Sequence, residues 1–130
     1  MGLKIKISTR IYPTEKEDVI RKAILSIFPD ANIKREEDYL IGYSSSMENF
    51  GKILREMRIR DAARGVFLSN LKGNKLIFRI NKQVATKGKI SFSVGDVPLG
   101  DITVIVEGDD LEDLIDKIAP DTRAQRSGHS

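Results

Sequence analysis

The stretch Leu71–Ser93, LKGNKLIFRINKQVATKGKISFS, decides the fold that we expect for this chain of 130 residues. Apolar residues alternate with polar or charged ones, first at Leu76, Phe78 and Ile80 and again from Ile90 and Phe92 to Val94, just after the stretch. This period of two predicts strands with one apolar face and one wet face. The stretch also holds six Lys and Arg residues and no Asp or Glu. A basic sheet surface is where a nucleic-acid partner would first be sought.

The residues at the start of the chain predict further strands and a helix. Alternation over residues 3–12 predicts a long strand with one buried face. Apolar residues at helical spacing over residues 15–28 predict an amphipathic helix. Residues 32–36 and 39–44, separated by a charged tip, are then expected to form a hairpin or one bent strand.

A second helical region follows the hairpin. We expect a helix over residues 46–64, a break at Gly65, and a shorter helix over residues 66–71. Two helix starts also show the spacing of a capping box, in which two side chains satisfy each other's backbone N–H groups, at Thr14 with Glu17 and at Ser45 with Glu48.

The last third of the chain predicts a central strand and a final helix. Residues 82–86 form either a helical turn or a bulged link, and residues 95–100 have the composition of a turn. The run Ile102–Val106 has apolar residues on both faces, as expected for a central strand. Four acids around Asp110 mark the start of the last helix, where the helix dipole favours negative charge.

This order of elements predicts one α+β domain over residues 1–120. Strands gather late in the chain and helices lie early, which favours a mixed β-sheet with helices packed on one face. Residues 121–130 are expected to be a disordered tail.

Composition excludes several classes of function. The chain has no cysteine, which removes disulfides and thiolate chemistry, and its single histidine, His129, lies in the expected tail. No phosphate loop or metal-ligand spacing is present, so we expect no enzyme and no cofactor. Apolar runs are far shorter than the ~20 residues of a membrane span. The expected location is therefore the cytoplasm.

The net charge of +3 conceals a strong asymmetry along the chain. Residues 52–89 hold eleven basic groups against Glu56 and Asp61, a balance of +9. Residues 90–121 hold Lys117 against nine acids, a balance of −8. Because these blocks nearly cancel, the choice of partner depends on where they meet in space and not on the total charge.

The basic block supplies the candidate site. We predict that phosphates would be contacted by Arg55, Arg58, Arg79, Lys82, Lys87 and Lys89. The competing interpretation of these residues is an ordinary solvated face. Phe78 and Phe92 fall in the apolar register of their strands, so we place them in the core and not on a base-stacking surface.

Several short motifs carry a resemblance to a known family. They are Tyr12-Pro13-Thr14-Glu15, the helix from Leu54-Arg55 to Asp61-Ala62-Ala63-Arg64, Asn81-Lys82-Gln83, Gly88-Lys89, and Pro98-Leu99-Gly100 before an apolar strand. On these residues the chain resembles archaeal uncharacterised protein family 0201 over about residues 3–119.

The resemblance implies an α+β fold similar to that of the ribosomal large-subunit protein that binds 5S RNA. It also implies a homodimer, and it brings no catalytic residues. RNA binding is therefore one hypothesis for the function. The alternative is a structural or protein-interaction dimer in which basic and acidic segments neutralise each other. We expect no membrane partner and identify no small-molecule ligand.

Overall fold

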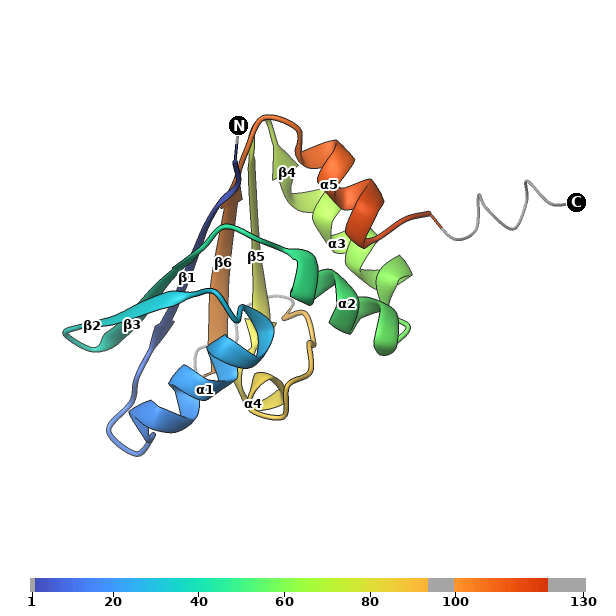
Figure 1. The fold of residues 1–130 in the computed structure, drawn as a ribbon. Coiled ribbons are helices and arrows are strands. Elements are labelled where there is room, and N and C mark those ends of the chain that lie inside the picture. Colours follow the sequence, from blue (N-terminus) through green and yellow to red (C-terminus); the bar gives the residue numbers. More distant parts are fainter. Residues whose placement is uncertain (1, 94–99, 122–130) are drawn as a thin grey trace, which may run out of the picture.

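The structure is a computed structural model that describes residues 2–93 and 100–121. It contains one six-stranded sheet with the strand order β2-β3-β1-β6-β5-β4. The strands are β1 (Lys4–Arg10), β2 (Asn32–Glu36), β3 (Tyr39–Ser44), β4 (Leu71–Lys72), β5 (Lys75–Asn81) and β6 (Asp101–Glu107). Figure 1 shows β1, β6 and β5 running side by side through the middle of the domain.

All of the strand pairs are antiparallel, so the prediction of a mixed sheet is wrong. β2 and β3 form the expected hairpin, and β4 and β5 form a second one. β6 lies between β1 and β5 and pairs with both, which confirms the predicted central strand. Antiparallel neighbours can be joined by a short hairpin link, as in β2–β3 and β4–β5, whereas parallel neighbours need a long crossover connection.

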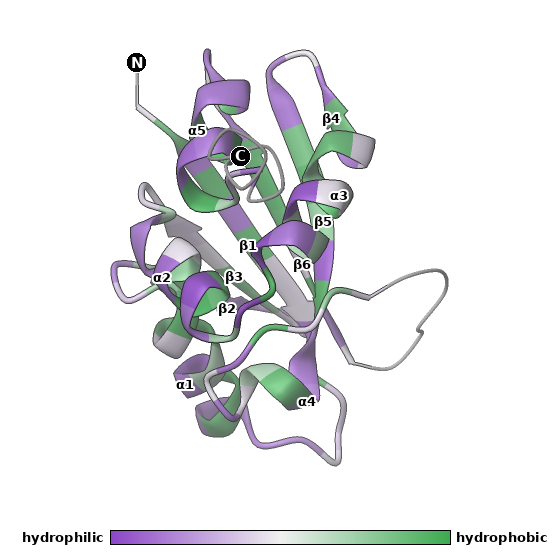
Figure 2. Cartoon of the chain, turned by 90° about the vertical axis from the view of Figure 1, so that its right-hand side faces the viewer, coloured by the Kyte–Doolittle hydropathy of each residue, from purple (hydrophilic) through white to green (hydrophobic). Residues whose placement is uncertain are grey.

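The helices cover one face of this sheet, as the sequence predicts (Figure 2). They are α1 (Glu17–Ile27), α2 (Glu48–Glu56), α3 (Arg60–Asn70), α4 (Lys82–Ala85) and α5 (Leu111–Ile118). Every second residue of the central strands is buried beneath them, for example Ile5 and Ile7 in β1 and Val104 and Val106 in β6. The alternate residues therefore face away from the helices.

Five phenylalanines hold the helices to the sheet. Phe50 of α2 contacts Phe28, Phe67, Phe78 and Phe92, with ring centroids 5.4–6.4 Å apart. Phe78 is 2% exposed and Phe92 packs against the same cluster, which confirms their predicted place in the core. Aromatic rings bury large apolar areas and gain further from edge-to-face contacts.

The break in the second helical region lies at Arg58 and not at Gly65. Arg58 has φ of 60°, and the backbone N–H of Ile59 donates to the carbonyl of Leu54, which ends α2 and turns the chain into α3. Gly65 lies inside α3, where its added methyl would meet open space. The turn directs Ala63 and Phe67 of α3 into the core, and this packing decides the break.

Neither predicted capping box forms. The residues at the N-caps of α1 and α2 are Lys16 and Met47, and neither makes a side-chain capping bond. In contrast, Asp110 accepts a hydrogen bond from the backbone N–H of Asp113 at the start of α5, where we expected an acidic cap.

Other predictions have mixed outcomes. The link at 82–86 is a helical turn, α4, and not a bulge. Near the expected strand at Ile90–Val94, the described residues show only a single bridge between Ile80 and Phe92. The turn at 95–99, the tail at 122–130 and His129 lie outside the described residues. Within the part of the chain that is described, no helix is long and apolar enough to cross a membrane.

Two glycines in helices give a matched test of this packing. A methyl group on Gly51 of α2 would lie 2.8 Å from Cγ2 of Ile118 in α5, whereas one on Gly65 would have no neighbour within 4 Å. We expect Gly65→Ala to stabilise the protein by about 0.5–1 kcal/mol, because alanine costs less helix entropy than glycine. Gly51→Ala gains the same term but forces α2 and α5 apart, at a cost of about 1–3 kcal/mol.

Urea unfolding of both variants measures the difference. Equal free energies of unfolding for the two variants would show that α2 and α5 do not pack as closely as described.

Candidate nucleic-acid interface

The face of the sheet that points away from the helices is open. Strand register places its side chains in rows across the sheet, and one row runs Asn32–Tyr43–Lys6–Ile105–Ile77. The next row along the strands is Lys34–Ile41–Ser8–Thr103–Arg79. No helix among the described residues packs on these rows.

Large apolar side chains are exposed on this open face. Tyr43 is 57% exposed, Tyr39 is 46% exposed and Ile77 is 44% exposed. The two tyrosines lie four residues apart on β3, so both rings project from the same side of the sheet. An exposed group of aromatic and aliphatic side chains on a sheet is typical of a binding surface.

Basic side chains surround the tyrosines. The cations of the open face are Lys4, Lys6, Arg10, Lys34, Lys75 and Arg79, and its acids are Glu36, Asp101 and Glu107. Two of these acids lie close to cations: Lys75 is 3.7 Å from Glu107, and Arg79 is 3.5 Å from Asp101. Lys4, Lys6 and Lys34 form no ion pair within the described ranges.

Arg35 does not belong to this face, although it is next to Lys34. Its guanidinium donates to Glu17 of α1 at 2.7 Å, on the helix side of the sheet. Hydrogen bonds from Arg21 and from Arg35 lower the pKa of Glu17 below its usual value. The alternation of β2 thus assigns Lys34 to the open face and Arg35 to the contact with α1.

The structure separates the six residues predicted from the sequence into three places. Arg79 lies on the open face. Lys82 is 1% exposed, and its Nζ donates to the carbonyl of Arg10 at 2.6 Å and to Glu15 Oε1 at 2.9 Å. Its ammonium also lies 5.2 Å from the centre of the Tyr12 ring. Lys82 therefore does not offer a charge at the surface, which contradicts its predicted role as a phosphate contact.

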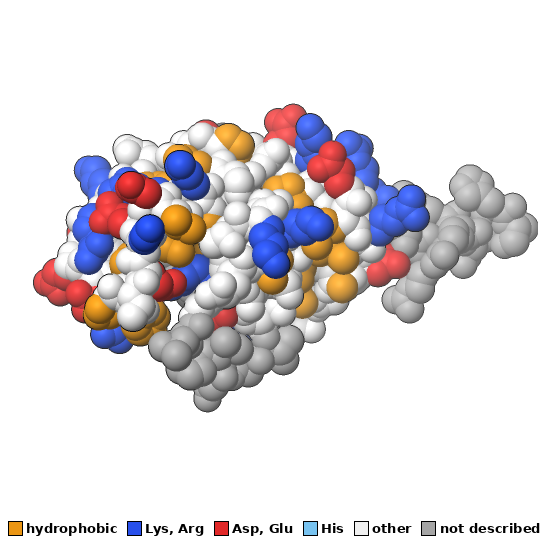
Figure 3. Space-filling view, turned by 90° about the horizontal axis from the view of Figure 1, so that it is seen from below, with side chains coloured by type: hydrophobic (Ala, Val, Ile, Leu, Met, Phe, Trp, Pro, Cys, Tyr) orange, Lys and Arg blue, Asp and Glu red, His pale blue; other side chains and the backbone are white. Residues whose placement is uncertain are grey.

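The other four predicted residues lie on the helix side, around the C-terminal end of α2. Arg55 and Arg58 are exposed there, and Lys87 and Lys89 line a shallow pocket with Ile53 and Met57. Seen from below, Lys and Arg side chains lie beside hydrophobic ones on this end of the molecule (Figure 3). Cations near a helix C-terminus are favoured by the helix dipole, which is one structural reason for this cluster.

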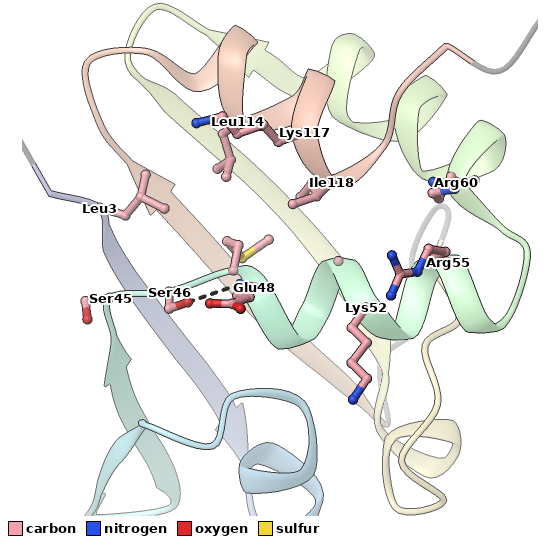
Figure 4. A pocket seen from close by; sticks show the side chains of 12 residues that line it. Leu3, Ser45, Ser46, Glu48, Lys52, Arg55, Arg60, Leu114, Lys117 and Ile118 are labelled. Atoms are coloured by element: carbon pink, nitrogen blue, oxygen red, sulfur yellow. Dashed lines mark hydrogen bonds between the residues drawn. The ribbon is translucent and has the colours of Figure 1, made fainter. Parts of the chain in front are cut away.

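A larger pocket of about 530 Å³ adjoins the same cluster, between α2 and α5. Figure 4 shows Leu3 at one end, Arg55 and Arg60 at the other, and Leu114 and Ile118 on the α5 side. Lys52 points away from α5 in this view. Arg60 and Arg55 both line this pocket, so Arg60 lies near the basic residues around Arg55.

The basic and acidic blocks of the sequence meet within the chain. Pairing of β5 with β6 sets Lys75 beside Glu107 and Arg79 beside Asp101, and packing of α3 near α5 sets Arg64 2.8 Å from Asp116. Part of the charge asymmetry is thus neutralised internally. The cations that keep no ion pair in the described segments include Arg55, Arg58, Lys87 and Lys89.

Sequence reasoning missed the tyrosines as surface residues. Tyr39 and Tyr43 alternate with Leu40 and Gly42, which are buried. The period-two pattern of this short segment therefore indicated that the two tyrosines share the face opposite to the core. The segment could not show that the tyrosine side is left uncovered, because both faces of a strand can be packed.

Comparison with known proteins identifies the family of this chain. A family model described as RNA binding matches residues 4–108. A UPF0201 protein of Methanothermobacter thermautotrophicus is 36% identical over 121 residues, covering 91% of this chain and 92% of its own length. The chain belongs to the archaeal UPF0201 family, which confirms the resemblance seen in the sequence.

Three further comparisons bear on fold and length. The crystal structure of an uncharacterised UPF0201 protein superposes with a TM-score of 0.85 at 36% identity, covering 91% of this chain and 94% of that one. A UPF0200/UPF0201 protein of Archaeoglobus fulgidus is 38% identical over 96% of this chain, but the chain spans only 40% of its length. A DUF54 protein of Methanothermobacter thermautotrophicus shares the fold at 17% identity and a TM-score of 0.67, with 92% of this chain and 99% of that one covered.

The buried ammonium of Lys82 should contribute to stability. We expect Lys82→Met to destabilise the protein by about 3 kcal/mol, because removing one partner of a buried ion pair leaves the other without compensation. The matched control is Lys87→Met, which alters an exposed lysine and should change the free energy of unfolding by no more than about 0.5 kcal/mol. Chemical denaturation gives both values, and a neutral Lys82→Met would contradict the described contact with Glu15.

Proposed function

We propose that this protein binds RNA through the open face of the sheet. The observation that carries the proposal is the presence of two exposed tyrosines among Lys4, Lys6 and Lys34 on a face that no described helix covers. The match to an RNA-binding family supports it. That match begins at the first residue of β1 and ends one residue after β6, so it includes the strands of the sheet and α1 to α4 but leaves out α5.

Charge and exposed rings are complementary parts of such a surface. Ammonium and guanidinium groups attract phosphates, and the release of counterions makes this attraction weaken with salt. Phosphate contacts position a nucleic acid without reading its sequence. The open face holds twice as many cations as acids, and its three lysines without ion pairs keep their charge available.

The basic surface around Arg55, Arg58, Lys87 and Lys89 stays a second prediction for phosphate contact. It lies on the helix side of the sheet, opposite to the tyrosines, so one short oligonucleotide cannot reach both surfaces at once. We favour the open face because it combines cations with exposed aromatic rings, and around Arg55 the described phenylalanines are in the core.

Self-association is the competing use of the open face. A homodimer and a fold like that of the 5S-RNA-binding ribosomal protein stay predictions drawn from the family resemblance. A dimer that covered Tyr39, Tyr43 and Ile77 would bury the largest apolar side chains of this face. Sedimentation velocity of the purified chain, with and without RNA, distinguishes these uses of the surface.

Neutralisation of two lysines tests the proposed surface. The double variant Lys6→Gln and Lys34→Gln should weaken RNA binding and flatten its salt dependence, because each lost phosphate contact lowers the slope by about 0.7–0.9. Fluorescence anisotropy with a labelled RNA at several salt concentrations measures both quantities.

The control for this test is Lys16→Gln with Lys22→Gln, which removes the same charge from exposed positions at α1. It should leave the slope unchanged. A second comparison is Lys87→Gln with Lys89→Gln, on the helix side. If this pair, and not Lys6 with Lys34, lowers the slope, the interface is the surface around α2. If wild-type protein fails to bind RNA at low salt, the proposed function is wrong.

A further inference from the structure

The open face contains the same arrangement of three side chains twice. Across β2, β3 and β1 one row reads Asn32–Tyr43–Lys6, and a second row, four residues earlier in β3, reads Glu36–Tyr39–Arg10. In each row a tyrosine lies between a polar side chain and a cation. Directly opposed side chains in antiparallel strands lie about 4.5–5.5 Å apart at Cβ, so each tyrosine is within reach of both neighbours.

Both rings are available to a partner. Tyr43 and Tyr39 are the two most exposed aromatic side chains of the described sheet, at 57% and 46%. Between the two rows, Ile41 lies opposite Ser8 on one side and Lys34 on the other. This middle row adds one apolar side chain and a further cation to the face. The face thus continues from one row to the next.

The distance between the rows limits the kind of nucleic acid that can use them. Four residues of an antiparallel strand span about 13–14 Å, whereas neighbouring bases of a duplex strand are about 3.4 Å apart. The flat faces of bases inside a duplex are also covered by their neighbours. Only unpaired and separated bases can place their faces on both rings, as single-stranded RNA does on the aromatic side chains of other sheet surfaces.

From this geometry we infer that the open face is a site for single-stranded RNA with two base-stacking positions, one on Tyr43 and one on Tyr39. Lys6 and Arg10 lie beside the rings for the phosphates on either side of each base. Asn32 and Glu36 lie on the opposite side of the rings, where the polar edge of a stacked base can hydrogen-bond. The inference rests on the proposed function, since it specifies the form of RNA that the same face takes.

Arg10 is partly engaged within the protein. Its guanidinium lies 5.0 Å from the centre of the Tyr12 ring and 3.8 Å from Asp38. Both Arg10 and Asp38 are more than half exposed at this contact, so an ion pair of this length contributes little to stability. An RNA phosphate can therefore take the place of Asp38 beside Arg10 at small cost.

The test compares single-stranded and duplex RNA on the full chain. A labelled twelve-nucleotide uridine oligomer should bind at least about tenfold more tightly than a duplex of the same length. Tyr43→Leu and Tyr39→Leu should each weaken single-strand binding about 5- to 150-fold, which corresponds to the 1–3 kcal/mol that one stacked base contributes. Tyr43→Phe, which keeps the ring, should bind as the wild type does.

Two controls separate stacking from other effects. Leu68→Ala removes an exposed apolar side chain from α3 on the helix side and should not change binding. The tyrosine variants should leave the salt slope intact, because they remove no phosphate contact. The chain has no tryptophan, so quenching of tyrosine emission on RNA binding reports on its three tyrosines, and it should largely disappear when Tyr39 and Tyr43 are both leucine.

The outcomes distinguish this inference from the proposed function. Salt-dependent RNA binding with equal affinity for duplex and single strand, and no effect of the leucine variants, would overturn the stacking sites but leave RNA binding standing. Failure of all RNA to bind would overturn both. A change in sedimentation coefficient for Tyr43→Leu without a change in RNA affinity would assign the face to self-association and overturn the inference.

Discussion

The insertion of β6 between β1 and β5 is the constraint on which the rest of the structure depends. β6 comes late in the chain, yet it joins the strands of the N-terminal part to the hairpin of the middle part through hydrogen bonds on both of its edges. Its buried residues Ile102, Val104 and Val106 then complete a continuous apolar surface on one side of the sheet. All of the described helices that pack on the sheet use that surface, and the opposite face is left to solvent.

The same insertion decides how charge is distributed. Because β6 lies next to β5, Asp101 and Glu107 are beside Arg79 and Lys75. These acids neutralise part of the charge of the basic block, residues 52–89. Lys82, the first residue of α4, is buried, and its ammonium donates to Glu15 and to the backbone carbonyl of Arg10. The cations that keep their charge at the surface divide between two sides of the sheet, and only the open side combines them with exposed tyrosines.

The UPF0201 family match extends over most of this fold. The family model described as RNA binding covers the strands and α1 to α4, and it ends one residue after β6. On the open sheet face, two exposed tyrosines lie in register with cations, Tyr43 opposite Lys6 and Tyr39 opposite Arg10. Phosphate attraction and base stacking can act on one ligand there, because the strand register sets both kinds of side chain in the same rows.

The sequence by itself determined most of the helices and strands, the burial of Phe78 and Phe92, the hairpin 32–36 with 39–44, the central place of 102–106 and the family, because these depend on local periodicity and short motifs. It did not determine that every strand pair is antiparallel, that the long helix breaks at Arg58, or that Lys82 is buried. Those outcomes depend on contacts between residues far apart in the chain, such as Lys82 with Glu15. Helices on one face of the sheet were expected from the sequence. Only the tertiary structure decided which face they cover and that Tyr39 and Tyr43 stay exposed on the other, because a strand's alternation shows two faces but not which of them a distant helix will cover.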